Sequence, residues 1–291
     1  MLVTLKEMMV VAEKEDKAIG AFNVTNYESL RAVINGAEEL NVPVIIQYAE
    51  VHEHLISLNE IGPLMLAMAK KAKVPVAVHL DHGASFNKCI EAIRLGFTSV
   101  MYDASDKPFE VNLSETKEIV KIAHAAGVSV EAELGSIYTS TIGGGEGRAN
   151  KTLEELKPEN MYTNPALAKE FVLESEVDCL AIAFGTVHGM YLTKPMLDLE
   201  RITTIKAEID VPLVMHGGSG ISQADFERAI SKGIRKINYY TYMNKAGGQA
   251  LVEEISTKDR QKPVFFDELA VIAYESMKQN VKEALSIFNR L

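Results

Sequence analysis

Eight short apolar runs, each followed by a stretch with helical spacing, restrict the fold of this chain more than any other feature of its sequence. The predicted strands are residues 19–24, 43–48, 74–80, 99–102, 128–134, 179–184, 211–215 and 236–240. The predicted helices that follow them are residues 27–40, 60–73, 86–95, 114–126, 165–174, 199–209, 223–232 and 244–255. Continuously apolar strands indicate a parallel sheet that is covered by helices. Eight strand–helix units favour an α/β fold with a closed (β/α)8 TIM barrel over an open, doubly wound sheet.

The ends of the chain add short helical segments to this barrel. Residues 4–12 have helical spacing with Thr4 in the N-cap position, and we interpret them as a short helix at one end of the barrel. A polar break precedes another helical pattern at 266–291, which we expect to pack on the barrel or on a neighbouring subunit. We therefore expect 1–291 to form a single barrel domain, with 258–291 as a terminal helical extension.

Composition excludes several classes of function. The formal net charge of -10 and the lack of a Lys/Arg tract argue against nonspecific nucleic-acid binding. No apolar stretch approaches the roughly 18 uninterrupted residues of a membrane helix. The first residues lack the apolar centre of a signal peptide, so we expect a cytoplasmic protein. Cys89 and Cys179 both lie in apolar surroundings, and we expect them to be buried free thiols.

Polar residues gather at the C-terminal ends of the predicted strands, where barrel enzymes build their active sites. These residues are Asn23, Asp81, His82, Asp103, Ser105, Glu131, Glu133, His188, His216, Asn238 and Thr241. A single buried polar residue is often only a hydrogen-bonded core group. So many of them at one rim indicate a functional site.

Three histidines at separate strand ends suggest one metal ion. His82, His188 and His216 follow three different apolar runs. Three neutral imidazoles suit Zn²⁺ and leave a fourth position for substrate or water, although each histidine alone could be a hydrogen-bonded rim residue. His52 and His54, which follow the second strand, either contact substrate or are solvated.

A glycine-rich turn suggests a phosphate site. Residues 217–220 read Gly-Gly-Ser-Gly and lead into a helix with Ser222 as a plausible N-cap. Barrels commonly bind phosphate in the loops after strands 7 and 8. A metal, a phosphate site and a carboxylate together suggest carbonyl chemistry, in which the metal stabilises an enediolate and the carboxylate moves a proton. A Schiff-base lysine finds little support, because Lys236 begins the eighth predicted strand rather than ending it.

Seven motifs of the barrel resemble those of the class II, zinc-dependent ketose-bisphosphate aldolases, which include fructose- and tagatose-bisphosphate aldolases. The motifs are AFNV (21–24), HLDHG (79–83), SVMYD (99–103), VEAELG (130–135), GTVHG (185–189), HGGSG (216–220) and KIN (236–238). The resemblance covers essentially the whole barrel. It implies that the chain is a lyase whose zinc ion is held by the three histidines named above.

The resemblance also implies roles for acidic residues. Glu133 and Asp103 match positions that contact the metal in alternative placements. Asp81 would act as the general acid/base that deprotonates the C4 hydroxyl group during cleavage. Glu146, in a glycine-rich loop after the fifth strand, would exchange the proton on the enediolate carbon; alternatively it is a solvated loop acid.

Substrate contacts follow from the same resemblance. The implied substrate-binding residues are Asn23, Gly189, Gly217, Gly218, Ser219, Asn238 and Thr241, of which the last six would hold the dihydroxyacetone phosphate half. A monovalent cation, Na⁺ or K⁺, would lie near this phosphate. The family usually forms dimers or tetramers, so we expect a homodimer or homotetramer.

The sequence departs from the family on the aldehyde side of the site. Residues 48–54 replace small residues that help to bind the second phosphate, and Glu50 would repel a phosphate dianion. Tyr239 and Tyr240 also replace small residues, and Arg260 is only an uncertain counterpart of the arginine that usually binds the distal phosphate.

The default substrate is fructose 1,6-bisphosphate. The alternatives are tagatose 1,6-bisphosphate, a ketose 1-phosphate with an unphosphorylated aldehyde half, metal-assisted hydrolysis and a non-catalytic sugar-phosphate-binding barrel.

Overall fold

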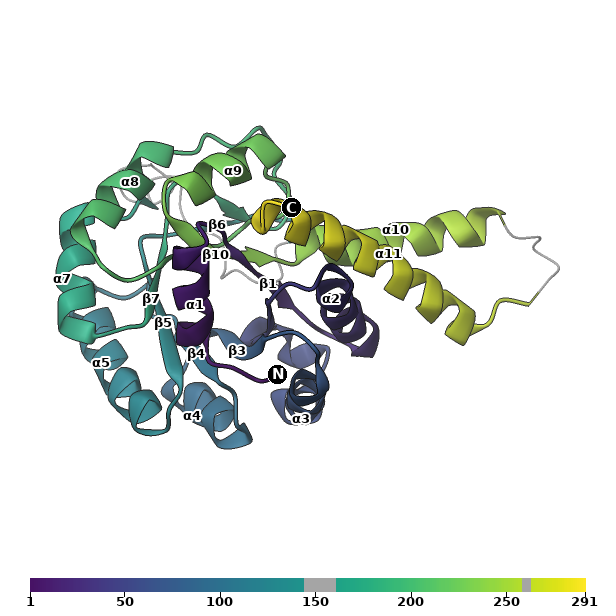
Figure 1. The fold of residues 1–291 in the computed structure, drawn as a ribbon, viewed down its shortest axis with the longest axis horizontal. Coiled ribbons are helices and arrows are strands. Elements are labelled where there is room, and N and C mark those ends of the chain that lie inside the picture. Colours follow the sequence, from purple (N-terminus) through teal and green to yellow (C-terminus); the bar gives the residue numbers. More distant parts are fainter. Residues whose placement is uncertain (144–160, 258–262) are drawn as a thin grey trace.

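The computed structural model describes residues 1–143, 161–257 and 263–291, and its centre is a closed barrel of parallel strands (Figure 1). Around the ring the strands follow the order β1–β10–β9–β7–β5–β4–β3–β2. Their bounds are β1 (Ile19–Asn23), β2 (Val44–Ala49), β3 (Val76–Gly83), β4 (Ser99–Tyr102), β5 (Ser129–Leu134), β7 (Cys179–Ile182), β9 (Leu213–Met215) and β10 (Ile234–Tyr239). Every residue of these strands is buried, which explains their continuous apolar runs. The predicted eight-stranded TIM barrel is confirmed.

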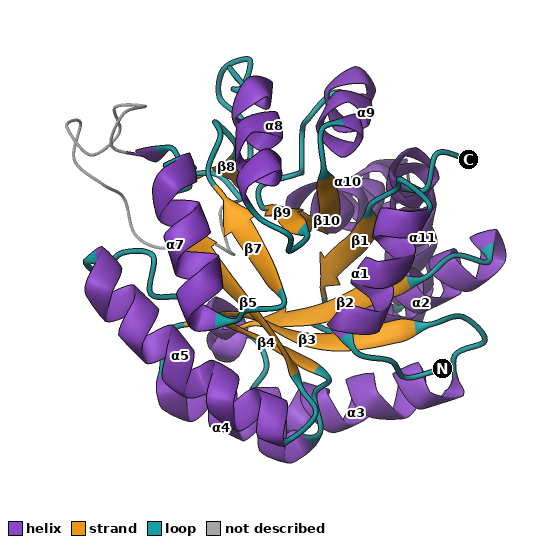
Figure 2. Cartoon of the chain, turned by 60° about the vertical axis from the view of Figure 1, so that its left-hand side comes forward, coloured by secondary structure: helices purple, strands orange, loops and turns teal. Residues whose placement is uncertain are grey.

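Helices surround the barrel on its outer side (Figure 2). They are α2 (Tyr27–Leu40), α3 (Leu58–Lys71), α4 (Phe86–Leu95), α5 (Phe109–Ala125), α7 (Pro165–Ser175), α8 (Leu199–Glu208), α9 (Gln223–Ser231) and α10 (Thr241–Thr257). The predicted start of α5 at residue 114 was wrong, because the helix already begins after Pro108. The proline ring holds its φ at -54°, close to the helical value, and so favours a helix that starts there.

The helix α1 (Leu5–Lys14) closes the N-terminal end of the barrel. It begins with a capping box, in which Thr4 Oγ1 accepts a hydrogen bond from Glu7 N (3.2 Å) and Thr4 N donates to Glu7 Oε2 (2.7 Å). Its side chains Leu5, Met8 and Met9 pack against strand residues inside the barrel. The predicted helix and its Thr4 cap are confirmed.

The last helix, α11 (Phe266–Phe288), lies against α2 and α10. Asn35 Nδ2 of α2 donates a hydrogen bond to the Tyr274 hydroxyl group at 2.8 Å. The Phe288 ring packs edge-on against Phe226 of α9, with ring centroids 4.9 Å apart. The outer parts of α10 and α11 extend together away from the barrel (Figure 1). The terminal extension therefore packs on the barrel at one end and projects from it at the other.

A short strand pair and a short helix near the C-terminal rim did not follow from the sequence pattern. The strands β6 (Tyr138–Thr139) and β8 (Val187–His188) form a separate parallel pair, in which Thr139 lies opposite His188. The 3-10 helix η1 (Glu50–His54) follows β2 directly. Pieces this short carry no readable periodicity, but both place residues at the mouth of the barrel.

Within the described part of the chain, no helix combines the length and the apolar character that crossing a membrane requires. Cys89 and Cys179 are buried and free, as predicted.

Candidate metal centre and active site

The three histidines predicted to bind a metal lie together. One ring nitrogen from each of His82, His188 and His216 lies within 4.8 Å of the others. The ring centroids are 5.0 Å apart for His82 and His188, 4.6 Å for His82 and His216, and 5.7 Å for His188 and His216. All three side chains are buried. The residues come from β3, from β8 and from the position directly after β9.

Two carboxylates set the orientation of these rings. His82 Nδ1 lies 2.8 Å from Asp103 Oδ2, and His216 Nε2 lies 2.9 Å from Glu131 Oε1. The opposite nitrogens, His82 Nε2 and His216 Nδ1, have no hydrogen-bond partner in the described structure, and neither has either ring nitrogen of His188. Buried nitrogens without partners are costly unless a ligand binds them. A carboxylate behind the imidazole is the usual support of a metal-binding histidine, and His82 and His216 both have one, so these residues fit a metal ion.

A local distortion of β3 makes this arrangement possible. Between Leu80 and Gly83 the pairing of β3 with β4 shifts register, and His82 has a φ of +46°. Left-handed backbone is uncommon for a residue other than glycine and is often found at functional sites. The extra residue allows the adjacent Asp81 and His82 both to contact groups of the site, whereas a regular strand would point them to opposite faces.

Asp81 is held by three amide groups from three other strands. Asn23 Nδ2 and Gln47 Nε2 donate to Asp81 Oδ2 at 2.8 and 3.1 Å. Asn238 Nδ2 donates to Asp81 Oδ1 at 2.9 Å. Burial alone would raise the pKa of Asp81, but the positive charges of nearby His82, His216 and Lys236 lower it to about 2. The carboxylate is therefore ionised and fixed in one orientation.

The glycine-rich turn lies at the same rim. Gly218 N donates to the carbonyl oxygen of Asn238 at 3.0 Å, and a Cβ atom on Gly218 would lie only 2.7 Å from that oxygen. Gly217 has a φ of +67°, and a Cβ atom there would lie 2.4 Å from the carbonyl oxygen of Val187. Only glycine fits at both positions. The turn leads into α9, whose N-cap Ser222 accepts a hydrogen bond from Asp225 N.

The remaining predicted residues are placed as follows. Ser219 Oγ accepts from Tyr242 N at 3.3 Å, and Thr241 Oγ1 donates to the Gly143 carbonyl oxygen at 2.8 Å. Gly189 follows β8 with a φ of +87°. Glu133 Oε2 lies 3.3 Å from His216 Nδ1. Glu146 and Arg260 lie outside the described residues.

Asp103, predicted as an alternative metal contact, lies against other groups. Besides His82, it accepts hydrogen bonds from Ser105 N at 3.1 Å and from Ser105 Oγ at 2.8 Å. In this structure it supports the imidazole of His82.

Sequence reasoning missed two residues of the site, Gln47 and Lys236, and the role of a third, Glu131. Gln47 contacts both Asp81 and Asn23, and its only signal was a polar residue within the apolar run of β2. Glu131 was noted at its strand end, but its role behind His216 was not predicted. Lys236 was placed away from the site, yet its Nζ donates to Asn238 Oδ1 at 2.7 Å. Its four-carbon side chain carries the charge far from the backbone position.

His52 of η1 is a further buried group at the mouth of the barrel. It is 2% exposed, and neither ring nitrogen has a hydrogen-bond partner in the described residues. Its ring packs against Tyr240, with centroids 4.8 Å apart. Burial lowers the pKa of His52 to about 4, against the opposing charge of Asp81, so the imidazole is neutral near pH 7.

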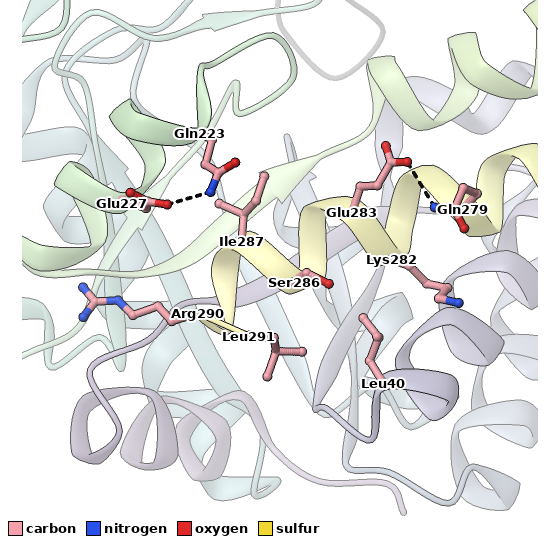
Figure 3. A pocket seen from close by; sticks show the side chains of 10 residues that line it. All are labelled: Leu40, Gln223, Glu227, Gln279, Lys282, Glu283, Ser286, Ile287, Arg290 and Leu291. Carbon is pink, nitrogen blue, oxygen red and sulfur yellow. Dashed lines mark hydrogen bonds between the residues drawn. The ribbon is translucent and has the colours of Figure 1, made fainter.

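A hollow beside the end of α11 belongs to another part of the molecule (Figure 3). Leu40 of α2, Gln223 and Glu227 of α9 and several α11 side chains line it. Gln223 Nε2 donates to Glu227 Oε1 at 2.8 Å, so these polar groups satisfy each other. The hollow contains none of the predicted site residues.

Fold and site together define an α/β barrel whose C-terminal rim holds a buried three-histidine cluster, suited to a metal ion, beside a fixed carboxylate. Residues 3–290 match the family model described as fructose-bisphosphate aldolase class II. The chain belongs to this family and is a class II aldolase.

Relatives and solved structures agree with this assignment over most of the chain. A Bacillus subtilis protein named "Probable fructose-bisphosphate aldolase" is 40% identical over 261 residues, covering 88% of this chain and 87% of its own. A Staphylococcus aureus fructose-bisphosphate aldolase is 37% identical, with 99% and 97% coverage. The crystal structure of the YdjI aldolase from Escherichia coli K12 superposes with a TM-score of 0.85 at 36% identity, covering 99% of this chain and 97% of that one.

Proposed function

We propose that this aldolase reversibly cleaves fructose 1,6-bisphosphate into dihydroxyacetone phosphate and glyceraldehyde 3-phosphate, with Zn²⁺ held by His82, His188 and His216. The observation that carries the proposal is the set of orphaned ring nitrogens directly beside the fixed carboxylate of Asp81. The names of relatives at 37–40% identity support the substrate. A metal ion held by these three histidines would supply a Lewis acid beside the ketose carbonyl group.

The residues of the chain carry the remaining steps. Asp81 accepts the proton of the C4 hydroxyl group as the C3–C4 bond breaks, and returns it in the reverse direction. Asn23 and Asn238 keep the carboxylate in position for this transfer. The glycine-rich turn of Gly217, Gly218 and Ser219 binds the phosphate of the dihydroxyacetone phosphate half through the backbone N–H groups of Gly217 and Ser219, since that of Gly218 donates to Asn238, and Gly189 and Thr241 support it. We propose Na⁺ or K⁺ beside that phosphate, and Glu133 and Asp103 as metal contacts in alternative placements of the metal.

We propose that Glu146 exchanges the proton on the enediolate carbon. Glu146→Gln is then expected to slow solvent proton exchange into dihydroxyacetone phosphate by about a hundredfold or more, the usual size of a general acid–base contribution. NMR in D₂O measures this exchange with the triose phosphate alone. Glu176→Gln, which replaces an exposed acid at the end of α7, is the matched control. Unchanged exchange in Glu146→Gln would leave Glu146 as a solvated loop acid.

A second candidate substrate is a ketose 1-phosphate whose aldehyde half carries no phosphate. The observation that favours it is the buried, neutral His52 with two free ring nitrogens, which offers hydrogen bonds to hydroxyl groups rather than charge to a phosphate. Next to it, the carboxylate of Glu50 accepts a hydrogen bond from Ala84 N at 2.8 Å. Lys88 is already paired with Glu53 at 3.2 Å and Glu91 at 2.8 Å.

Specificity constants decide between the two substrates. For the bisphosphate enzyme we expect kcat/KM to favour fructose 1,6-bisphosphate over fructose 1-phosphate by about a hundredfold or more, roughly 2.7 kcal/mol. A ratio near one or below favours the second candidate. In that case His52→Ala should lower kcat/KM for fructose 1-phosphate at least tenfold, while His54→Ala, an exposed neighbour, should not. Tagatose 1,6-bisphosphate in the same assay tests the stereochemistry at C4.

We propose that the protein forms a homodimer or homotetramer through the projecting part of α10 and α11. Large apolar side chains are exposed there, including Phe266 at 82%, Val252 at 64% and Val271 at 55%. Exposed apolar groups gathered on one projection commonly mark an interface. Phe266→Asp is expected to shift the mass from light scattering toward the monomer, whereas Leu173→Asp, a control on α7 that is 70% exposed, should not. A monomeric wild-type protein would contradict this proposal.

A further inference from the structure

Lys236 is a buried charge that the proposed reaction does not use. Its side chain is fully buried inside the barrel, as is that of Glu131, and Nζ lies 2.8 Å from Glu131 Oε2. Lys236 Nζ also donates to Asn238 Oδ1 at 2.7 Å. A buried ion pair costs desolvation and is weak evidence for stability by itself. The reason for this buried pair is therefore to be found in the contacts that Glu131 and Lys236 make with other residues.

On one side, Lys236 supports the carboxylate behind a metal ligand. Glu131 uses Oε2 for Lys236 and Oε1 for His216 Nε2, so His216 Nδ1 is the nitrogen left for the metal. The other neighbours of Glu131 are weaker partners, since the Cys179 thiol donates to Oε2 over 3.7 Å and His79 Nε2 lies 3.6 Å from the same oxygen. Without the ammonium group, the buried carboxylate of Glu131 would keep His216 as its close charge partner but lose the one at Oε2.

On the other side, Lys236 determines which way the amide of Asn238 points. An ammonium group has only donors, so it accepts nothing and requires the oxygen of the amide. With Oδ1 of Asn238 engaged by Lys236, Nδ2 is directed at Asp81 Oδ1, 2.9 Å away. The amide is thus held at both ends, and Asp81 keeps one of its three donors.

We propose that Lys236 is a positioning residue that holds the metal ligand His216 and the base Asp81 in one hydrogen-bonded frame, through Glu131 and Asn238 respectively. This inference rests on the proposed roles of those two residues. It assigns Lys236 no bond to substrate, in keeping with a metal-dependent mechanism rather than a Schiff base.

The test begins with zinc affinity in Lys236→Met, which removes the charge at similar volume. Competition with a chromogenic chelator should show zinc binding at least tenfold weaker than in the wild type, the usual cost of losing support behind a metal ligand. At saturating zinc, kcat should fall at least tenfold while KM changes less than threefold. Lys278→Met is the control, because Lys278 pairs with Glu39 and Glu275 outside the site.

A double variant separates positioning from simple charge compensation. Glu131→Gln with Lys236→Met leaves no buried charge from the pair, so it should fold even if Lys236→Met alone does not. At saturating zinc, its kcat should remain at least tenfold below that of Glu131→Gln alone, because Asn238 has lost its partner. If the double variant and Glu131→Gln have equal kcat values, Lys236 acts only as the counter-ion of Glu131, and the proposal is overturned.

The zinc measurement stands apart from the proposed reaction. If the wild-type protein turns over neither fructose 1,6-bisphosphate nor fructose 1-phosphate, the proposed function fails while chelator competition still applies. If folded Lys236→Met binds zinc as tightly as the wild type does, the inference is overturned, whether or not the wild type turns over either substrate.

Discussion

Removal of the metal with a chelator is expected to abolish the release of dihydroxyacetone phosphate from fructose 1,6-bisphosphate, and zinc is expected to restore it. The physical reason is that His82, His188 and His216 offer buried ring nitrogens without a hydrogen-bond partner among the described residues, and Glu133 Oε2 lies only 3.3 Å from one of them, His216 Nδ1. Metal binding should also stabilise the fold, by about 4 kcal/mol when free zinc exceeds its dissociation constant a thousandfold. A coupled assay and thermal unfolding, before and after zinc is returned, measure both effects.

Substitution separates loss of the metal site from other effects of the chelator. His188→Ala should give the metal-free phenotype even in excess zinc, because it removes one of three ligands. His124→Ala is the matched control, since His124 lies on α5 and pairs with Asp178 at 2.8 Å, outside the cluster. Full turnover by the chelated protein would contradict the zinc assignment. Inactivity of the zinc-loaded protein on fructose 1,6-bisphosphate would instead direct the search to ketose 1-phosphates.

Asp81→Asn is expected to lower kcat by about 10²–10⁴-fold, the range of general acid–base catalysis, with zinc still bound. The substitution keeps the size of the side chain but removes the charge that accepts the proton. Zinc should stay because Asp81 is held by Asn23, Gln47 and Asn238 rather than by the histidine rings. Coupled kinetics and zinc content, measured on the same sample, give the two results.

The control for this variant is Asp210→Asn, which changes an exposed carboxylate outside the site. A kcat for Asp81→Asn within threefold of the wild-type value would rule out Asp81 as the acid/base. Loss of zinc together with turnover would show that Asp81 supports the metal site, and a different base would have to be found. Retained zinc with lost turnover also excludes a barrel that only binds sugar phosphates.

Much of the site was predictable because a closed parallel barrel brings strand ends together. Asn238, Asn23 and Asp81 lie on β10, β1 and β3, far apart in sequence, yet β10 pairs with β1 and β2 lies between β1 and β3. A polar residue at the end of an apolar run can be recognised in the sequence alone, and the barrel brings several such residues to one rim. Gln47 is also a polar residue in an apolar run, but it lies within the run of β2 rather than at its end and was overlooked.

Other features could not be predicted from local patterns. The register shift in β3, with the left-handed backbone of His82, depends on how β3 pairs with β4. The two-residue strand β8 that carries His188 exists only through its pairing with β6. Neither of these strand pairings produces a periodic pattern in the sequence.

The sequence by itself determined the barrel, the polar rim and the three histidines, because hydrophobic periodicity and residue type are local properties. Only the tertiary structure decided which nitrogen of His82 and of His216 faces the metal site, since that depends on Asp103 behind His82 and Glu131 behind His216. It also decided the place of Lys236, whose backbone lies near the start of β10 while its Nζ meets Glu131 and Asn238. Long side chains and imidazole orientation are set by partners from other strands, and those partners are neighbours only once the barrel has closed.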